Sequence, residues 1–400
     1  MIINSMTRRA LTVATFCAAL PAMAQEPPVR IGYLSDMSGA GSSIGGASSF
    51  PAIEMAIEDF GGEVLGRSID YVSADQLNKP DVGLGVAREW LDQGGVTMIL
   101  DANNSAVSLA VGELTARRKV IYMSGGSTMK LTNEACNRYM TQWIPDTYAL
   151  AHSLAKPIVE GGNDKWFFIA VDYAFGHDLA AQGKAAVEAA GGTVLGVARH
   201  SPQTSDYSAF LLEAQASGAD TVALATFGSY MVNLIKQANE FGMEVKLVPF
   251  FLSLEDIHSI GLDNMHNVTG TTAFYWDRTD ASRAWSARYE ERFGRPATFL
   301  NAQQYSAVTH YLKSVAQAGT TDGDAVADAM MELAVGDATD ISAVVRPDGR
   351  VARDMYLIDV KSPADSVGQW DLARVVATVD KADASLPLEQ STCPLVTAGE

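Results

Sequence analysis

Short apolar runs alternate along the chain with segments whose apolar residues recur at helical spacing. A chain that repeats strand, helix, strand builds a parallel sheet, because right-handed crossovers return each strand to the same sheet. This pattern predicts a doubly wound α/β block at the start of the chain. Its expected strands and helices are, in order, 29–34, 47–60, 68–74, 82–91, 98–100, 106–111 and 120–123.

A second block of the same kind follows an extended, proline-containing stretch at 139–148. The repetition predicts a second α/β lobe of similar construction, and later segments can return to either lobe. The elements expected from here on are 148–159, 166–171, a helix ending at 190, 193–198, 207–216, 220–226, 231–241, 245–251, 281–293, 301–318 and 355–360.

Two strands of the first block end in small residues that carry hydroxyl or amide groups. One strand leads into Asn104 and Ser105, and the next leads into Gly125, Gly126 and Ser127. A helix that opens at such a turn leaves backbone N–H groups free, and with the helix dipole these groups attract an anion. Parallel strands meet at one sheet edge, so the sequence predicts a ligand-binding edge there.

Aromatic residues mark the corresponding strand ends of the second block. They are Tyr173 and Phe175, then Phe227, then Phe250 and Phe251. Such residues are often core, but these lie where an α/β domain opens its cleft. We expect them to form an apolar wall that accepts a ring.

The N-terminal segment predicts export to the periplasm, and the net charge bears on the partners of the protein. Arg8 and Arg9 precede the short apolar run 10–20, and Ala24 ends a small-residue cleavage site, so we expect residues 1–24 to be a signal peptide and the mature protein to be periplasmic. Removing those two of the 29 basic residues leaves 27 against 47 acidic residues, a net charge near −20. This charge argues against nucleic acid and anionic membranes as partners.

The remaining cysteines, Cys136 and Cys393, are expected to form a disulfide in an oxidising compartment. Two separate free thiols are the alternative. The pair would tie the C-terminal tail 386–400 to the loop after the second turn.

Catalytic, cofactor and metal chemistry find little support in the sequence. The glycine-rich stretch 38–46 lacks the third glycine of a dinucleotide motif at Ile44, and we expect instead a loop that approaches a small ligand. The histidines are scattered without metal-ligand spacing, and no Gly-x-Ser-x-Gly elbow is present. Asp172 and Asp178 flank His177, where helix capping is the preferred interpretation. We therefore expect neither an enzyme nor a cofactor or metal.

The chain resembles the periplasmic substrate-binding proteins of ATP-driven uptake systems, of the branched-chain amino-acid-binding type. The resemblance covers the whole mature chain and is carried by 31–39, 104–111, 125–127, 172–176 and 304–313. It implies a type I Venus-flytrap fold, with two doubly wound parallel-sheet lobes joined by three crossovers near Ile144, Thr272 and Val351. The implied lobes are 25–144 with 273–351, and 145–272 with 352–385.

The resemblance also implies a site between the lobes and a partner. Lobe 1 would hold a ligand carboxylate through Asn104, Ser105, Gly125 and Ser127, lobe 2 would close Phe175 and Phe227 over it, and an inner-membrane permease would receive it from a monomeric protein. Trp143 and Tyr148 either touch the ligand or stiffen the hinge. The full set of expected ligand-binding residues is Ile44, Asn104, Ser105, Gly125, Gly126, Ser127, Trp143, Tyr173, Phe175, Phe227 and Phe251.

One departure from the family bears on the ligand. Amino-acid binders of this type carry an acid in lobe 2 that pairs with the ligand's ammonium group, whereas the stretch 248–253 has no acid before Glu255. Because an unpaired buried ammonium costs several kcal/mol, we expect an aromatic carboxylate of the benzoate or phenylpropanoid kind. A branched-chain amino acid or amide ligand remains an alternative, as does a ligand-sensing module for a membrane kinase.

Overall fold

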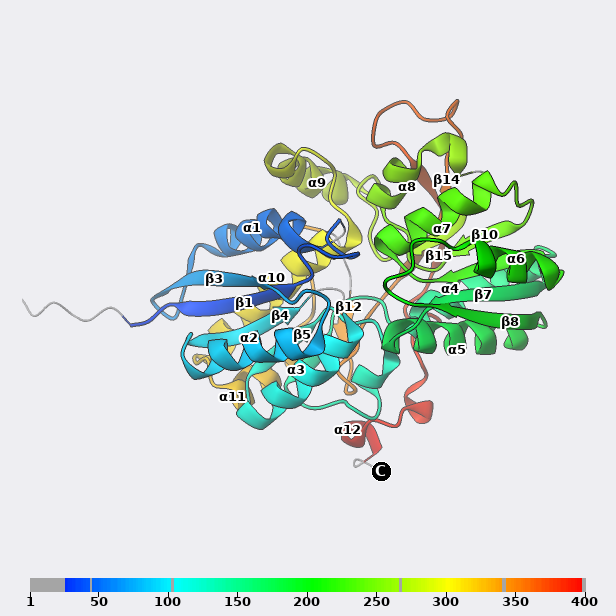
Figure 1. The fold of residues 1–400 in the computed structure, drawn as a ribbon. Coiled ribbons are helices and arrows are strands. Elements are labelled where there is room, and N and C mark those ends of the chain that lie inside the picture. The colour runs from blue at the N-terminus through cyan, green and yellow to red at the C-terminus, as the bar shows by residue number, and fades with distance from the viewer. Residues whose placement is uncertain (1–25, 44, 102–103, 266–267, 340–342, 398–400) are drawn as a thin grey trace, which may run out of the picture.

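The protein has two lobes that lie side by side, as the computed structural model in Figure 1 shows. The structure describes residues 26–43, 45–101, 104–265, 268–339 and 343–397. The expected signal peptide and Ile44 therefore lie outside the described residues. Within this part of the chain, no helix is long and apolar enough to cross a bilayer.

The first lobe is a parallel sheet with helices on both faces. Its elements are β1 (Val29–Ser35), α1 (Phe50–Phe60), β2 (Glu63–Val64), β3 (Arg67–Asp75), α2 (Pro80–Asp92), β4 (Val96–Asp101), α3 (Ser105–Arg118), β5 (Ile121–Ser124), β6 (Met140–Gln142), α9 (Asp280–Phe293), α10 (Phe299–Ala318), α11 (Gly323–Glu332), β12 (Ala343–Val345) and β13 (Val351–Arg353). The sheet has the order β2-β3-β1-β4-β5-β6, and β2 alone among its described strands runs antiparallel to its neighbour. Helices α9 and α10 return late in the chain to pack against α1.

The second lobe repeats the plan with fewer parallel strands. Its elements are α4 (Thr147–Glu160), β7 (Lys165–Val171), α5 (Ala174–Ala189), β8 (Thr193–His200), α6 (Ser208–Ala216), β9 (Thr221–Ala225), α7 (Gly228–Glu240), β10 (Lys246–Pro249), α8 (Leu254–Ile260), β11 (Thr269–Thr272), β14 (Met355–Val360) and β15 (Ala373–Val379). The parallel sheet has the order β10-β9-β7-β8, and an antiparallel sheet β11-β14-β15 lies next to β10. Short helices complete the chain: η1 (Gly46–Ser49), η2 (Met129–Thr132), η3 (Leu262–Asn264), η4 (Leu388–Gln390) and α12 (Pro394–Thr397).

The central strands are apolar because helices cover both of their faces. From Trp166 to Val171, every residue of β7 is buried, and the burial of β1 is almost as complete. A parallel strand covered on both faces reads as a continuous apolar run, which explains why the sequence predicts these strands well. The expected two-lobed α/β fold is confirmed, and the antiparallel sheet of the second lobe is an addition that the alternating pattern did not indicate.

The chain crosses between the lobes after β6, after β11 and between β13 and β14. A buried ion pair ties two of these crossings together, since Arg350 Nε lies 3.1 Å from Asp146 Oδ2. Arg350 also donates a hydrogen bond through Nη1 to the carbonyl of Ile144. Asp146 in turn accepts a bond from the N–H of Ala149 and begins α4. One charged pair therefore fixes both the crossing and the start of a helix.

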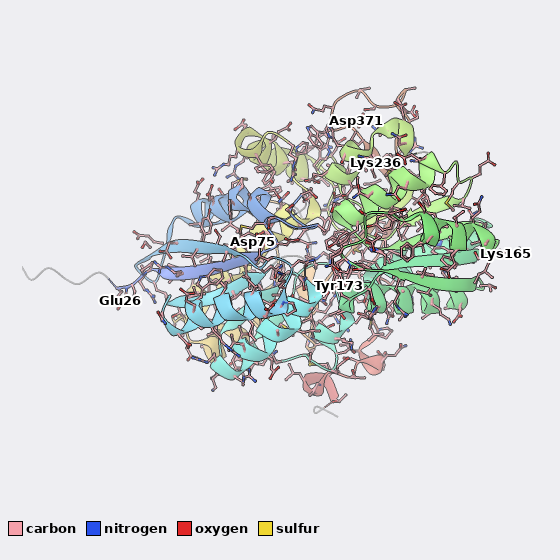
Figure 2. All side chains as sticks on the ribbon, viewed as in Figure 1. Glu26, Asp75, Lys165, Tyr173, Lys236 and Asp371 are labelled. Atoms are coloured by element: carbon pink, nitrogen blue, oxygen red, sulfur yellow. A yellow bond between two sulfur atoms is a disulfide. The ribbon has the colours of Figure 1, made fainter. Side chains whose placement is uncertain are left out.

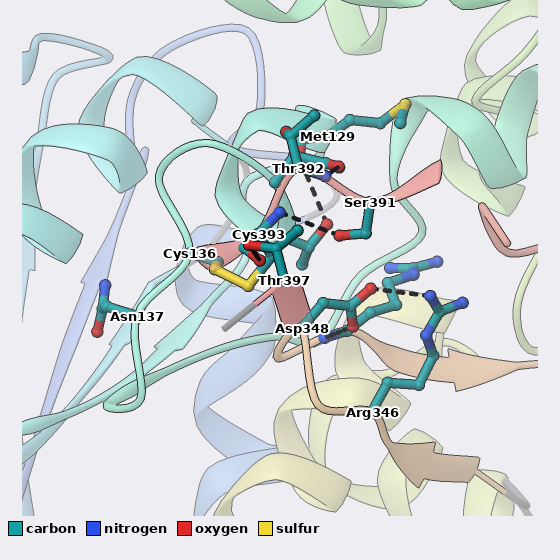
Figure 3. Close-up of a disulfide and its surroundings, with 12 residues drawn as sticks. Met129, Cys136, Asn137, Arg346, Asp348, Ser391, Thr392, Cys393 and Thr397 are labelled. Carbon is teal, nitrogen blue, oxygen red and sulfur yellow. Dashed lines mark hydrogen bonds and ion pairs between the residues drawn. A yellow bond between two sulfur atoms is a disulfide. The ribbon is translucent and has the colours of Figure 1, made fainter. Parts of the chain in front are cut away.

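The expected disulfide between Cys136 and Cys393 is confirmed, with Cα atoms 5.6 Å apart (Figure 3). After β15, which belongs to the second lobe, the tail runs back to the first lobe. There the N–H of Thr392 donates to Asn133 Oδ1 at 3.1 Å. The tail is therefore a covalent connection between the lobes in addition to the three crossings.

Candidate functional site

A small cavity lies between the two lobes. Its volume is about 20 Å³, which is room for a single water molecule, so a larger ligand enters only when the lobes part. The residues that line it come from both lobes and the first crossing: Ser105, Ser127, Ile144, Tyr173, Phe175, Phe227 and Phe251. Six of these seven belong to the set expected from the sequence, and Ile144 was expected as a hinge residue.

The first lobe contributes two hydroxyl groups. Ser105 Oγ accepts hydrogen bonds from the N–H groups of Ser127 at 3.2 Å and Thr128 at 3.1 Å. Both lone pairs of this oxygen are then engaged, so its remaining capacity is to donate its proton. Among the described residues, Ser127 Oγ has no hydrogen-bond partner. The two hydroxyls can therefore both donate to an acceptor in the cavity.

The second lobe contributes a wall of aromatic rings. Phe175 stands edge-on to Phe227, with ring centroids 5.6 Å apart, and edge-on to Phe251 at 6.4 Å. Edge-to-face packing of this kind fixes the rings and leaves an apolar surface toward the ligand. Phe250 points the other way and packs on Phe168 in the lobe core, with ring centroids 6.0 Å apart.

Tyr173 is the polar member of this wall and lies at the face between the lobes (Figure 2). Burial raises the pKa of its phenol well above the ordinary value, and the charge of Asp36 and the nearby Tyr230 add to the shift. The phenol therefore stays protonated at every physiological pH. It can donate a hydrogen bond as well as present its ring.

Asn104, Gly125 and Gly126 lie beside the cavity without lining it. Asn104 is the N-cap of α3: its Oδ1 accepts a bond from the N–H of Val107 at 2.8 Å, and its Nδ2 donates to Asn78. Gly126 packs so closely on Ser108 that an added Cβ would come within 2.6 Å of the hydroxyl. These residues shape the turns that carry the two serines.

Trp143 does not line the cavity. Its indole is buried in the first lobe, where Nε1 donates to Thr141 Oγ1 at 2.9 Å and the Arg353 guanidinium lies 5.8 Å from the ring centre. The ring of Tyr148 stacks on that of His152, with ring centroids 3.8 Å apart. Both aromatic residues thus pack beside the first crossing.

Glu255, the first acid after the stretch that lacks one, is paired with an arginine of the other lobe. Its carboxylate forms an ion pair with the Arg295 guanidinium, and the two side chains are only 11% and 10% exposed. Burial raises the pKa of this carboxyl to about 7, although the charge of Arg295 lowers it. Its negative charge is therefore already matched within the protein when the lobes are closed.

Two further contacts join the lobes around the cavity. Asp178 of α5 accepts hydrogen bonds from Thr128 Oγ1 and from the N–H of Met129, both at 2.7 Å. At the glycine-rich loop, the Ala40 carbonyl accepts a bond from the N–H of Ser229 at 3.3 Å. This loop therefore reaches the second lobe.

The interpretation of Asp172 and Asp178 as helix caps is wrong. Tyr173 is the N-cap of α5, and no side chain among the described residues caps that helix. Asp172 instead lies 2.6 Å from His177 Nε2 at an exposed position, and Asp178 reaches the first lobe. Contacts between lobes depend on distant parts of the chain, so local spacing could not reveal them.

Among the described residues that line the cavity there is no His, Cys, Asp or Glu side chain. Within the described residues, no three His, Cys, Asp or Glu side chains gather closely enough to hold a metal ion. The lining offers hydroxyl donors and rings. The arrangement is suited to binding and enclosing a small molecule.

Comparison with known proteins agrees with this architecture. A periplasmic binding protein from Burkholderia mallei superposes with a TM-score of 0.90 at 39% identity, covering 92% of this chain and 99% of that one. A second structure, from Burkholderia xenovorans, is described as a branched-chain amino acid ABC transporter periplasmic ligand-binding protein. It superposes with a TM-score of 0.82 at 34% sequence identity, covering 92% of this chain and 100% of that one. A solute-binding protein of an ABC transporter from Rhodopseudomonas palustris, solved with 3,4-dihydroxybenzoic acid, superposes with a TM-score of 0.81 at 20% sequence identity. The match covers 88% of this chain and 98% of that one.

Relatives found by sequence are also binding proteins by name, and they match a shorter part of the chain. The chain is 25% identical to Leu/Ile/Val-binding protein homolog 8 of Brucella abortus over 244 residues, which is 58% of this chain and 59% of that protein. The family model described as periplasmic binding protein matches residues 28–366, most of the chain. With this match and the two-lobed fold together, the chain belongs to the periplasmic binding protein family.

Proposed function

We propose that this protein is exported to the periplasm and serves as the solute-binding component of an ABC uptake transporter, with a small aromatic carboxylate as its ligand. The lobes close around the ligand, and the closed form delivers it to an inner-membrane permease. Ligand binding then shifts an equilibrium between open and closed forms, because the site is complete only when the lobes meet.

The observation that carries this proposal is the pairing of two hydroxyl donors with a ring-lined wall across one cavity. Ser105 and Ser127 offer protons to an acceptor, and the Phe175, Phe227 and Phe251 rings offer an apolar face. A carboxylate accepts such bonds strongly, and an aromatic ring packs well against edge-on phenylalanines.

The described lining contains no acid that could pair with an ammonium group. Glu255 is bound to Arg295, so an α-amino acid would bury its ammonium without a counter-charge. That burial costs several kcal/mol, which reduces affinity by orders of magnitude. The charge balance supports a ligand without an ammonium group.

A branched-chain amino acid is the second candidate, because the 34% identical relative from Burkholderia xenovorans carries that description. The complex with 3,4-dihydroxybenzoic acid supports the aromatic candidate only in showing that the same fold can enclose such a ring. The two candidates differ in the ammonium group, so one panel of ligands separates them.

The test is a thermal-shift screen of ligand-stripped protein against benzoate, 4-hydroxybenzoate, cinnamate and leucine. A ligand at 100 times its Kd stabilises the protein by about 2.7 kcal/mol, which is readily measured. A shift with the aromatic acids alone supports the proposal. A shift with leucine alone refutes the ligand class, and no shift with any of them refutes both candidates.

Ser127→Ala tests the hydroxyl donors. Removing one donor to a charged acceptor costs about 1.5–3 kcal/mol, so we expect Kd for the bound aromatic acid to rise at least about tenfold. Ser229→Ala is the matched control, since its exposed hydroxyl lies at the cleft edge without lining the cavity. Isothermal titration calorimetry measures both, and equal affinities of the two variants would remove Ser127 from the site.

A further inference from the structure

Asp178 of the second lobe makes hydrogen bonds with two residues of the first lobe. Its Oδ2 accepts from Thr128 Oγ1 at 2.7 Å and from the N–H of Met129 at 2.7 Å. The same oxygen accepts a third bond from Thr147 Oγ1 at 2.8 Å. Thr147 begins α4, so this bond stays within the second lobe.

The residues that Asp178 holds are those that carry the ligand-facing serine. The N–H groups of Ser127 and Thr128 both donate to Ser105 Oγ, and the Ser127 carbonyl accepts from the N–H of Thr147 at 2.8 Å. Thus the segment 127–129 is held by Ser105 on one side and by Asp178 and Thr147 on the other. Its position decides where Ser127 Oγ points and which direction is left for the Ser105 proton.

We propose that Asp178 is a positioning residue that couples closure of the lobes to capture of the ligand, by clasping the 127–129 segment in the closed form only. The inference rests on the proposed function for its ligand, but not for the closure itself. Parting of the lobes separates Asp178 from Thr128 and Met129, while its bond to Thr147 remains. Closure therefore adds two bonds to a carboxylate and fixes the serine hydroxyls at the same time.

This coupling predicts which rate changes when the clasp is lost. A ligand enters the open form, in which the clasp is absent, so loss of Asp178 should not slow association. It leaves only after the closed form opens, and opening breaks the two bonds. Asp178→Ala should therefore raise the dissociation rate at least about tenfold without lowering the association rate.

Asp172→Ala is the matched control. Asp172 belongs to the same lobe and lies six residues earlier, and its carboxylate pairs, within the described part of the chain, with the exposed His177 alone. Asp178→Asn is a second variant that keeps the volume and one acceptor oxygen, and it should give an intermediate dissociation rate. Thermal denaturation of each variant shows whether the fold is kept.

The experiment has a kinetic arm and a ligand-free arm. Stopped-flow binding of 4-hydroxybenzoate and of leucine gives both rates. Spin labels at Asp81→Cys on α2 and Glu213→Cys on α6, both exposed, report the distance between the lobes with the native disulfide kept. We expect Asp178→Ala to shift the distance distribution toward longer separations, with or without ligand, and Asp172→Ala to leave it unchanged.

The two arms separate the clasp from the ligand assignment. If neither probe binds but Asp178→Ala still lengthens the distances, the proposed ligand class fails and the clasp stands. If a probe binds with unchanged dissociation rate and unchanged distances in Asp178→Ala, the clasp is refuted and the ligand assignment stands. Unchanged distances with no bound probe, or equal effects of Asp172→Ala, also refute the clasp.

Discussion

The buried ion pair between Glu255 and Arg295 predicts that ligand binding tightens as the pH falls. Glu255 belongs to α8 in the second lobe, and Arg295 lies between α9 and α10 in the first. Opening the lobes separates the pair and returns the carboxylate to water. The perturbation is therefore a change of pH, with Glu255→Gln as the variant that removes the titrating group.

The magnitude follows from the pKa of Glu255 in the two forms. Burial in the closed form raises this pKa from 4.5 to about 7, so the closed form binds more protons than the open form between these values. The cost of closing over the ionised carboxylate is then roughly 3 kcal/mol at pH 8 and about 1.4 kcal/mol at pH 5.5. Closure gains stability as pH falls, and this gain is lost as pH rises through 7.

We therefore expect the affinity for an aromatic carboxylate to rise up to about 25-fold between pH 8 and pH 5.5. Calorimetry at the two pH values measures it, and the ligand remains ionised throughout. Glu255→Gln should abolish most of the dependence. Asp256, whose carboxyl pKa burial raises to about 6, is held by Ser253 within the same helix and does not change partners on opening. Affinity that is independent of pH, or a slope kept in Glu255→Gln, would refute the reasoning.

Two further predictions concern the wall and the tail. Phe227→Leu removes the ring that stands edge-on to Phe175, so it should weaken binding of an aromatic ligand about five- to tenfold with little effect on a leucine-sized one, as calorimetry would show. The double change Cys136→Ser and Cys393→Ser releases a cross-link between residues 257 apart, and it should lower the free energy of unfolding by about 2–5 kcal/mol in chemical denaturation. An unchanged denaturation midpoint would show that the tail stays docked without its covalent bond.

The sequence predicts those elements whose burial pattern is uniform. The strand expected at 355–360 coincides with β14, and the one at 166–171 differs from β7 by a single residue. By contrast, β15 was missed because six of its seven residues, all but Ala373, are at least partly exposed. Helix α8 was missed because its seven residues are too few for a helical pattern. The helix expected from 47 begins as η1 and becomes α1 only at Phe50.

The cavity was predictable for a related reason. Ser105, Ser127, Phe175 and Phe227 stand directly after strands or at helix starts, and the topology of parallel sheets brings such positions to one edge. The placement of Trp143 was not predictable, because one aromatic residue after a strand can face either side. Its partner Arg353 lies more than two hundred residues later in the chain.

The contacts between the lobes could not be predicted from the sequence. They affect the choice of ligand as well as the closure of the lobes. Asp178 and Glu255 are two of 47 acidic residues, and only the closed arrangement shows that each is committed to a partner in the other lobe. With both carboxylates engaged, the polar groups left facing the cavity are hydroxyls that donate protons. Because both carboxylates are engaged with the opposite lobe, neither is available to pair with a ligand ammonium group, which favours an anionic ligand. Arg295→Met removes the positive charge that lowers the pKa of Glu255, so we expect the buried carboxyl to stay protonated at pH 7 and the pH dependence of ligand affinity to move to higher pH, which calorimetry between pH 5.5 and pH 9 measures.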